Sequence, residues 1–428
     1  MTPQFVAALA AIPFALLITI GGIRSPVRLL AFYALLVPFG SAILLPIGLP
    51  DAFRSSTSVV GALLIAATVA HLLTGRRRSA RLAPAVAIWL LLLGLTVLSV
   101  LWSINSAETE RSLLVLASLI ALYVFATFLA VGGSDLRWLE TGLAGGGAIT
   151  GIIGLVELAQ GTVALNGGEA GRFHISGGEG GDPNITAASL LLPLAVALTR
   201  ASRADTVRTR LAFFAAAILS GTGIVLTLSR GGLIAAAVVL VVLGAHETRA
   251  RVAAAYLLLP TVAAAGVLMT THVSRVGSGS STGRSQIWRL GLEACPRYCW
   301  AGSGWSTFRD VYEQRVLTTP WANRPGNLVR FSAHDFVLAG VIEAGFAGVV
   351  LMLAGIGSIV RDLLRIGRDV RAAALAGLLA IVVSNFFVNN FAFKYFWLGL
   401  IYASLVAGGY TRGPVPRRRG AAVVVRAR

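Results

Sequence analysis

Apolar runs of about 17 to 25 residues recur along almost the whole chain, and an α-helix needs this length to cross a bilayer. Lipid offers no partners to backbone amides and carbonyls, so a chain with many such runs has to fold as a helix bundle. The sequence therefore predicts an all-α integral membrane protein with about 12 transmembrane helices, or about 13 depending on the N-terminal topology, in a single domain over residues 1–428. The runs lie near residues 4–22, 29–48, 57–75, 83–102, 112–132, 138–160, 184–200, 211–229, 231–247, 252–270, 335–360, 372–389 and 392–410.

Charge restricts the classes of partner. With 56% hydrophobic and 13% charged residues, the chain is far from a soluble globular domain. A formal net charge of +18 would suit nucleic acid, but the cations fall in short loops between apolar runs rather than on one face. We therefore exclude nucleic acid as a partner. Lys394 is the only lysine. Arginine suits bidentate phosphate contacts, but a GC-rich genome is at least as good an explanation of the arginine bias as a whole, so only the positions of single arginines carry an argument.

The distribution of arginine also predicts the orientation of the helices. Short loops rich in arginine stay in the cytoplasm, which applies to Arg76–Arg81, 200–210, 248–251, 361–371 and the tail from Arg412. The connections 102–111, 161–183, 229–231 and 271–334 then lie on the outer face, and each contains arginine. The first apolar run has no Lys or Arg before it, which predicts an uncleaved membrane segment.

Residues 271–334 form the one long polar interruption, and we expect them to make a large periplasmic loop. The loop contains eight arginines and three acidic residues. Ser285–Leu292 and Ser306–Leu317 have the apolar spacing of short amphipathic helices that lie along a membrane surface. Cys295 and Cys299 are the only cysteines; on an outer loop they form a disulfide or remain free thiols, and two ligands cannot complete a metal site.

The sequence His334-Asp335-x-x-Leu338, followed by Glu343-x-Gly345, ends this loop at the start of an apolar run. A histidine with a pKa near neutrality can take a proton from a sugar hydroxyl as that hydroxyl attacks, so His334 is the candidate catalytic base. Asp335 or Glu343 is the candidate to orient the ring or stabilise the imidazolium. The structural alternative is an ordinary polar residue at a helix end.

Three outer arginines are candidates to bind an anionic group. Arg230 lies in a very short connection, Leu228-Ser229-Arg230-Gly231-Gly232, which is predicted to face the outside. Arginines that set membrane topology lie on the cytoplasmic side, so a functional role is expected for this one. Arg284 belongs to Gly283-Arg284-x-x-x-Trp288, and Gly302-Ser303-Gly304 downstream is a weak phosphate-loop pattern that more often marks a turn. Arg172 precedes Asp182-Pro183-Asn184, where Asp182 or Asn184 is alternatively just a helix cap.

Together these motifs resemble the O-antigen ligase and polymerase superfamily of bacterial membrane glycosyltransferases, with Phe396-Trp397 in the last run also similar. The resemblance covers nearly the whole chain in topology but only short motifs in identity. Asp335 departs from the asparagine that often follows the histidine in the family. The resemblance implies a type C glycosyltransferase fold in the bacterial inner membrane, with the active site on the periplasmic side.

In the ligase branch the resemblance implies transfer of O-antigen polysaccharide from undecaprenyl pyrophosphate to a sugar hydroxyl of lipid A-core. By this likeness His334 activates the acceptor, and Arg230, Arg284 and Arg172 neutralise the leaving pyrophosphate. Arginines can take the role of a metal ion there. Because the outer acids are scattered, we expect no metal and no cofactor, and a single displacement would invert the anomeric centre.

Other functions stay open on the sequence alone. An O-antigen polymerase or a protein O-oligosaccharyltransferase of the same superfamily would carry similar motifs. A lipid or solute transporter would also have a dozen helices, but it would place charged or broken helices at mid-membrane and show an internal duplication. A structural scaffold would not need an arginine-rich loop that ends in histidine. The sequence does not indicate the glycan structure, the acceptor or the oligomeric state.

Overall fold

The computed structural model describes residues 25–44, 55–74, 83–129, 131–163, 171–175, 181–246, 284–319, 332–389 and 391–411. Within these ranges the fold is helical, and the only bridge of β type joins Leu44 and Ser55. Seven of the described helices are long and apolar enough to cross a membrane. They are α4 (Ser56–Leu73), α5 (Pro84–Leu98, continued by η2, Ser99–Trp102), α6 (Ser106–Thr127), α7 (Gly133–Ala159), α8 (Pro183–Arg203), α9 (Val207–Leu226) and α14 (Phe336–Leu364).

The other described helices are shorter or carry more charge. They are α2 (Pro26–Leu36), η1 (Gly40–Ala42), α10 (Arg230–His246), α12 (Arg284–Tyr298), α13 (Phe308–Val316), α15 (Arg368–Asn385) and α16 (Lys394–Thr411). The predicted runs 4–22 and 252–270 lie outside the described residues, so the count of about 12 helices stays a prediction.

The predicted run 29–48 is not one continuous helix. Helix α2 has only 11 residues and ends at Leu36, and a 3₁₀ turn follows at Gly40–Ala42. Pro38 has no amide hydrogen to continue the helical hydrogen bonds, which explains the end of α2 at this point. Hydropathy alone did not reveal this break.

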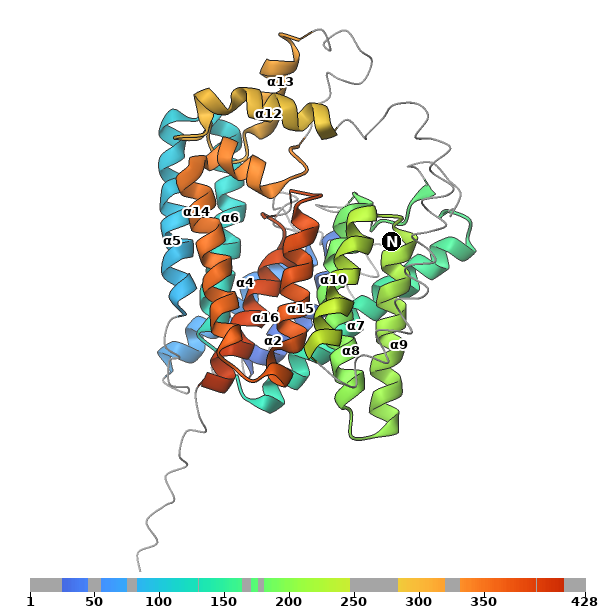
Figure 1. Ribbon diagram of the computed structural model, residues 1–428. Coiled ribbons are helices and arrows are strands. Elements are labelled where there is room, and N and C mark those ends of the chain that lie inside the picture. Colours follow the sequence, from blue (N-terminus) through green and yellow to red (C-terminus); the bar gives the residue numbers. More distant parts are fainter. Residues whose placement is uncertain are drawn as a thin grey trace, which may run out of the picture.

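Helix α8 lies at the centre of one half of the bundle, against α7, α9, α10 and α15 (Figure 1). Protein buries 83% of its most apolar window, against 28% for α9. Its N-terminus therefore has a fixed position within the bundle. The second half consists of α4, α5, α6, α14 and α16, which contact one another.

Glycines let α7 approach two neighbours at backbone distance. A Cβ atom at Gly142 or Gly146 would overlap carbonyl oxygens of Ala31 or Leu35 in α2, and one at Gly151 would overlap Leu219 O in α9. Between helices in a membrane there is no hydrophobic driving force, so association depends on close van der Waals packing, which small residues permit. The glycine-rich sequence of α7 thus accounts for its place between α2 and α9.

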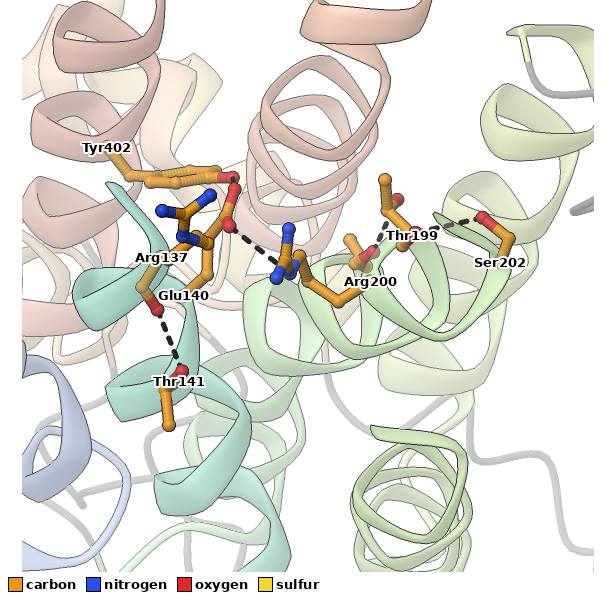
Figure 2. Close-up of polar contacts among 8 residues, drawn as sticks. Arg137, Glu140, Thr141, Thr199, Arg200, Ser202 and Tyr402 are labelled. Atoms are coloured by element: carbon orange, nitrogen blue, oxygen red, sulfur yellow. Dashed lines mark hydrogen bonds and ion pairs between the residues drawn. The ribbon is translucent and has the colours of Figure 1, made fainter. Parts of the chain in front are cut away.

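A partly buried carboxylate connects the two halves at the end of the bundle where α8 turns into α9 (Figure 2). Tyr402 Oη in α16 donates to Glu140 Oε1 in α7 at 3.0 Å, and Arg200 Nε in α8 lies 3.5 Å from Glu140 Oε2. The Arg200 guanidinium also packs over the Phe213 ring. A partly buried charge is stabilised by such partners, and this cluster joins α7, α8 and α16.

At the opposite end, α12 and α13 lie over the half of the bundle with α5, α6 and α14 (Figure 1). Their apolar sides face each other and α14, through Leu290 and Ala294 of α12, Phe308 and Val311 of α13, and Ile342 of α14. These faces are therefore used for packing on the bundle. Cys295 and Cys299 form a disulfide across the last turn of α12.

Candidate active site

The head of α14 holds His334 in an unusual backbone conformation. His334 has φ +48°, in the left-handed region that non-glycine residues seldom adopt. Its Nδ1 atom is buried and has no hydrogen-bond partner among the described residues. Such strain persists only where neighbouring structure imposes it, and it is frequent at active sites.

Asp335 directly after it begins the helix. Asp335 Oδ1 accepts hydrogen bonds from Val337 N at 2.9 Å and Leu338 N at 2.8 Å, so this carboxylate is the N-cap of α14. Burial raises the pKa of Asp335, and the two amide hydrogen bonds oppose that rise. The sequence allowed Asp335 to orient the histidine ring, whereas its hydrogen bonds in the structure go to the helix.

Glu343 lies further along α14, beside a break in that helix. Its Oε1 accepts from Phe308 N at 3.2 Å at the start of α13, and the side chain is 6% exposed. Gly345 has φ +70° and interrupts the helical bonds. The backbone of 299–304 fills the gap, because Ser303 N donates to Ile342 O at 2.7 Å and Phe346 N donates to Cys299 O at 2.8 Å.

The pattern Gly302-Ser303-Gly304 belongs to this packing. Both glycines have positive φ, and a Cβ atom would meet Glu343 O at one position and the Ser103 side chain at the other. These glycines thus allow neighbouring chain segments to approach closely. The pattern therefore behaves as a turn, which was the alternative to a phosphate-binding loop. Glu343 and Gly345 together fix the loop helices on α14.

Trp288 connects α12 to the segment before His334. Trp288 Nε1 donates to Ala333 O at 3.0 Å, and Arg284 lies one turn earlier on the same helix. Because Ala333 directly precedes His334, this hydrogen bond holds α12, and with it Arg284, in a fixed position relative to His334. The sequence motif contained Trp288 but did not indicate this role.

A second group forms around Asn184 at the N-terminus of α8. Asn184 Oδ1 accepts from Ser229 Oγ at 2.7 Å and from Arg172 Nη2 at 3.3 Å. Its amide Nδ2 donates to Asp182 Oδ1 at 2.8 Å, and Asp182 also caps α8. Arg172 Nε donates to Thr227 O at 2.9 Å. Asn184 is thus the centre of a hydrogen-bond network that joins Arg172, the N-terminus of α8 and the turn after α9.

Ser229, directly before Arg230, connects this network to the start of α10. Its Oγ accepts from Gly232 N at 3.0 Å, so Ser229 caps the start of α10 while it donates to Asn184. Gly231 and Gly232 pack tightly on Phe387 and Ala187. Arg230 itself is exposed at the first position of α10. The turn is thereby fixed by the Asn184 hydrogen bond and by the packing of its two glycines, while its arginine remains exposed.

Electrostatic interactions connect the two groups. Burial lowers the pKa of His334; Arg284 and Arg309 lower it further, and Asp182 opposes them. Burial also lowers the pKa of Arg284, with Asp182 acting in the opposite sense and Arg230 in the same sense. The pKa of the candidate base is therefore lowered by burial and by arginines of α12 and α13, near a carboxylate at the head of α8.

This arrangement suits transfer of a group from an anionic leaving group to a hydroxyl. A neutral imidazole can accept a proton at neutral pH, and fixed guanidinium groups stabilise charge that develops on phosphate oxygens. Within the described residues, no three side chains of His, Cys, Asp or Glu gather in a way that could hold a metal ion. Among the described residues, the arginines whose charges act on the His334 ring are Arg284 and Arg309.

Comparison with known protein families gives a match over part of the chain. Residues 215–353 match the family model for O-antigen ligase. The resemblance of the chain to the O-antigen ligase superfamily is thereby confirmed. No curated protein matches the chain.

The O-antigen ligase match includes Arg230, Arg284 and His334, whereas Arg172 and Asn184 lie before it. The superfamily consists of membrane ligases and polymerases of the glycosyltransferase type, which supports a role as an enzyme on lipid-linked polysaccharide. Sequence reasoning missed Ser229 as a cap and Arg309 as a cation near the histidine. Asn at a helix start carries a weak signal, but no pattern in the sequence indicates which arginine it contacts.

Proposed function

We propose that the protein is an O-antigen ligase that transfers O-antigen polysaccharide from undecaprenyl pyrophosphate to a sugar hydroxyl of lipid A-core at the periplasmic face of the inner membrane. The observation that carries the proposal is the buried, unpartnered Nδ1 of His334, with α12 and its Arg284 tied to the same segment by the Trp288–Ala333 hydrogen bond. The same end of the bundle bears the Cys295–Cys299 disulfide, a bond that persists in oxidising compartments such as the periplasm.

His334 acts as the general base. One ring nitrogen takes the proton of the acceptor hydroxyl while the hydroxyl oxygen forms a bond to the anomeric carbon of the donor sugar. The bond from that carbon to the pyrophosphate oxygen breaks, and the electron pair leaves with the pyrophosphate. Attack opposite the leaving group inverts the anomeric centre.

Arg230 and Arg284 bind the departing pyrophosphate. Guanidinium groups make paired, charge-assisted hydrogen bonds to phosphate oxygens. Arg172 is a less direct participant, because two of its donors already contact Thr227 O and Asn184 Oδ1. We propose that the arginines replace a metal ion, so that the reaction needs none.

Transfer assays with purified protein test the reaction. Undecaprenyl-pyrophosphate oligosaccharide is incubated with lipid A-core, without acceptor, or with a pilin-like protein. We expect a product with lipid A-core, a loss of about 10²-fold or more for His334→Ala, and retained activity for the control His71→Ala. Activity that survives EDTA supports metal independence, whereas a loss restored by Mg²⁺ or Mn²⁺ contradicts it.

The reactions with different acceptors distinguish the proposed ligase from related enzymes and from a transporter. Longer lipid-linked chains from donor alone would identify an O-antigen polymerase, and glycosylated pilin would identify a protein O-oligosaccharyltransferase. No transfer to any acceptor by a folded protein would favour a transporter. Each of these results overturns the choice of lipid A-core.

A further inference from the structure

A crevice between α2, α4 and α6 lies apart from the residues assigned to transfer. Its volume is about 120 Å³, and its walls are mostly apolar, with Ile65 from α4 and Val115, Leu119 and Leu122 from α6. Ala62 and Ser118 at its sides are exposed, whereas Tyr33 and Thr57 at its floor are buried. The crevice thus opens sideways between two helices that are long and apolar enough to cross the membrane.

One end of the crevice is polar and positively charged. Lys394, the only lysine of the chain, lines it and donates from Nζ to Ser55 Oγ at 3.1 Å. Ser55 caps the 18-residue helix α4, and its hydroxyl lies 2.9 Å from Ser58 Oγ and 3.2 Å from Thr57 Oγ1. A cation, a helix N-terminus and hydroxyl groups therefore meet above an apolar groove.

This distribution of charge matches one kind of occupant. Lys394 is the first residue of α16 and Ser56 the first of α4, so the polar end lies at the end of the spans, where lipid headgroups are. The apolar walls continue down α4 toward mid-membrane. A phosphate at Lys394 and an acyl chain along Gly61 and Ile65 would meet the groups that each requires.

We propose that this crevice binds an anionic phospholipid, with the phosphate at Lys394 and one acyl chain in the groove between α4 and α6. Gly61 lines the groove, and a Cβ atom there would make ordinary van der Waals contacts with the Tyr33 ring at 3.5 Å and Leu122 Cδ1 at 4.0 Å, so a larger side chain would occupy the groove. None of the lining residues is one assigned to transfer, so lipid binding here can be measured without a glycan donor.

Native mass spectrometry of the full chain in neutral detergent tests the proposal. Phosphatidylglycerol is added, and phosphatidylcholine and inorganic phosphate serve as separate probes. We expect one retained phosphatidylglycerol with higher affinity than phosphatidylcholine, and no competition by millimolar inorganic phosphate. Loss of one juxtamembrane cation should weaken binding about five-fold in Lys394→Gln, which corresponds to about 1 kcal/mol.

Matched variants distinguish lipid bound in the crevice from lipid bound elsewhere on the protein. Gly61→Leu should abolish retention by filling the groove, whereas Gly94→Leu in α5, where an added side chain meets nothing within 4 Å, should bind as the wild type does. Arg111→Gln removes an exposed cation from the same end of the bundle and should also have no effect.

Equal retention in Lys394→Gln and Arg111→Gln would overturn the proposal, as would equal binding of the two lipids. No retained lipid on the wild type would do the same, and would indicate that another part of the chain fills the crevice. If Gly61→Leu does not fold, Lys394→Gln decides the outcome. Because no glycan donor is present, failure here is distinguishable from failure of the proposed transfer reaction.

Discussion

At the scale of single residues, the charge state of His334 determines whether the site can work at neutral pH. A histidine whose pKa is lowered on folding is neutral over a wider pH range and remains available as a base. Burial comes first among the causes, followed by Arg284. The same guanidinium that is proposed to bind pyrophosphate thus also lowers the pKa of the base.

We predict that Arg284→Gln moves the acid limb of the pH profile of kcat/KM to higher pH. Removal of the positive charge makes the imidazolium less unfavourable, so the pKa of His334 rises towards its ordinary value. Asp182→Asn should move the limb the other way. The control Arg289→Gln, at an exposed position on the same helix, should leave the limb in place. An unchanged profile in both variants would contradict the electrostatic coupling.

Asn184 offers a second prediction at this scale. Asn184→Ala leaves Ser229 Oγ and Arg172 Nη2 without their shared acceptor, which costs about 1–3 kcal/mol of stability. Because Ser229 caps α10, Arg230 should lose its fixed position and KM for the donor should rise more than kcat falls. The control Asn105→Ala removes an amide that caps α6, so it should lower stability with KM unchanged. Equal KM values in the two variants would contradict the role of Asn184.

The sequence predicted the charged participants at the site better than their neutral partners. Arg230, Arg284 and His334 stand out because charged groups at a membrane surface are costly and few. Asn184 and Ser229 are polar residues at helix ends, where such residues occur for capping alone. Their contacts depend on how α8, α9 and α10 pack, and this information is not local to any segment.

At the scale of elements, the break in α14 determines how the loop helices are held. A helix that continued unbroken through Gly345 would satisfy its own carbonyls and leave no acceptor for the backbone of 299–304. Hydropathy predicted a span over 335–360, which agrees with α14 (Phe336–Leu364). The break was not predictable, because it results from hydrogen bonds to a distant segment rather than from apolar periodicity.

Gly345→Ala should destabilise the protein by at least about 2 kcal/mol, since the residue has φ +70° and a Cβ atom would lie 2.3 Å from Trp300 O. Gly357→Ala in the same helix meets nothing within 4 Å and should be neutral or slightly stabilising. Chemical denaturation of both variants in detergent measures the difference. Similar midpoints would show that the break in α14 is not required.

The hydrogen bond between Trp288 and Ala333 gives the other prediction for an element. Trp288→Phe keeps an aromatic ring on α12 but loses the donor to Ala333 O, at a cost of about 1 kcal/mol. We expect kcat to fall several-fold while circular dichroism stays unchanged. Trp300→Phe, at a tryptophan that is 79% exposed, is the control and should keep the wild-type kcat. A wild-type rate for Trp288→Phe would mean that α12 is positioned by its apolar contacts alone.

At the scale of the whole molecule, the contacts of Glu140 tie the two halves of the bundle together. Tyr402 belongs to the half with α14, and Arg200 to the half built around α8. The arginines proposed to bind pyrophosphate and the histidine are divided between these halves and the covering helices. Any change in the angle between the halves would therefore separate Arg230 from His334.

A double-mutant cycle on Glu140 and Tyr402 tests this connection. Tyr402→Phe and Glu140→Gln should each lower the free energy of unfolding, and the double variant should lose less than the sum, with a coupling energy of about 0.5–3 kcal/mol. Transfer activity should fall in parallel although the cluster lies at the far end of the bundle. Additive losses of stability would show that the two side chains act independently.

The enclosure of α8 has a consequence for the membrane in which the protein works. Helices with lipid-facing surfaces, such as α9, tilt or shift when bilayer thickness does not match their apolar length. Helix α8 has protein around most of its surface, so mismatch reaches it only through its neighbours. The head of α8, with Asp182 and Asn184, should thus remain in register while the periphery adapts. Activity in bilayers of graded acyl length should accordingly vary little until the whole bundle loses its packing.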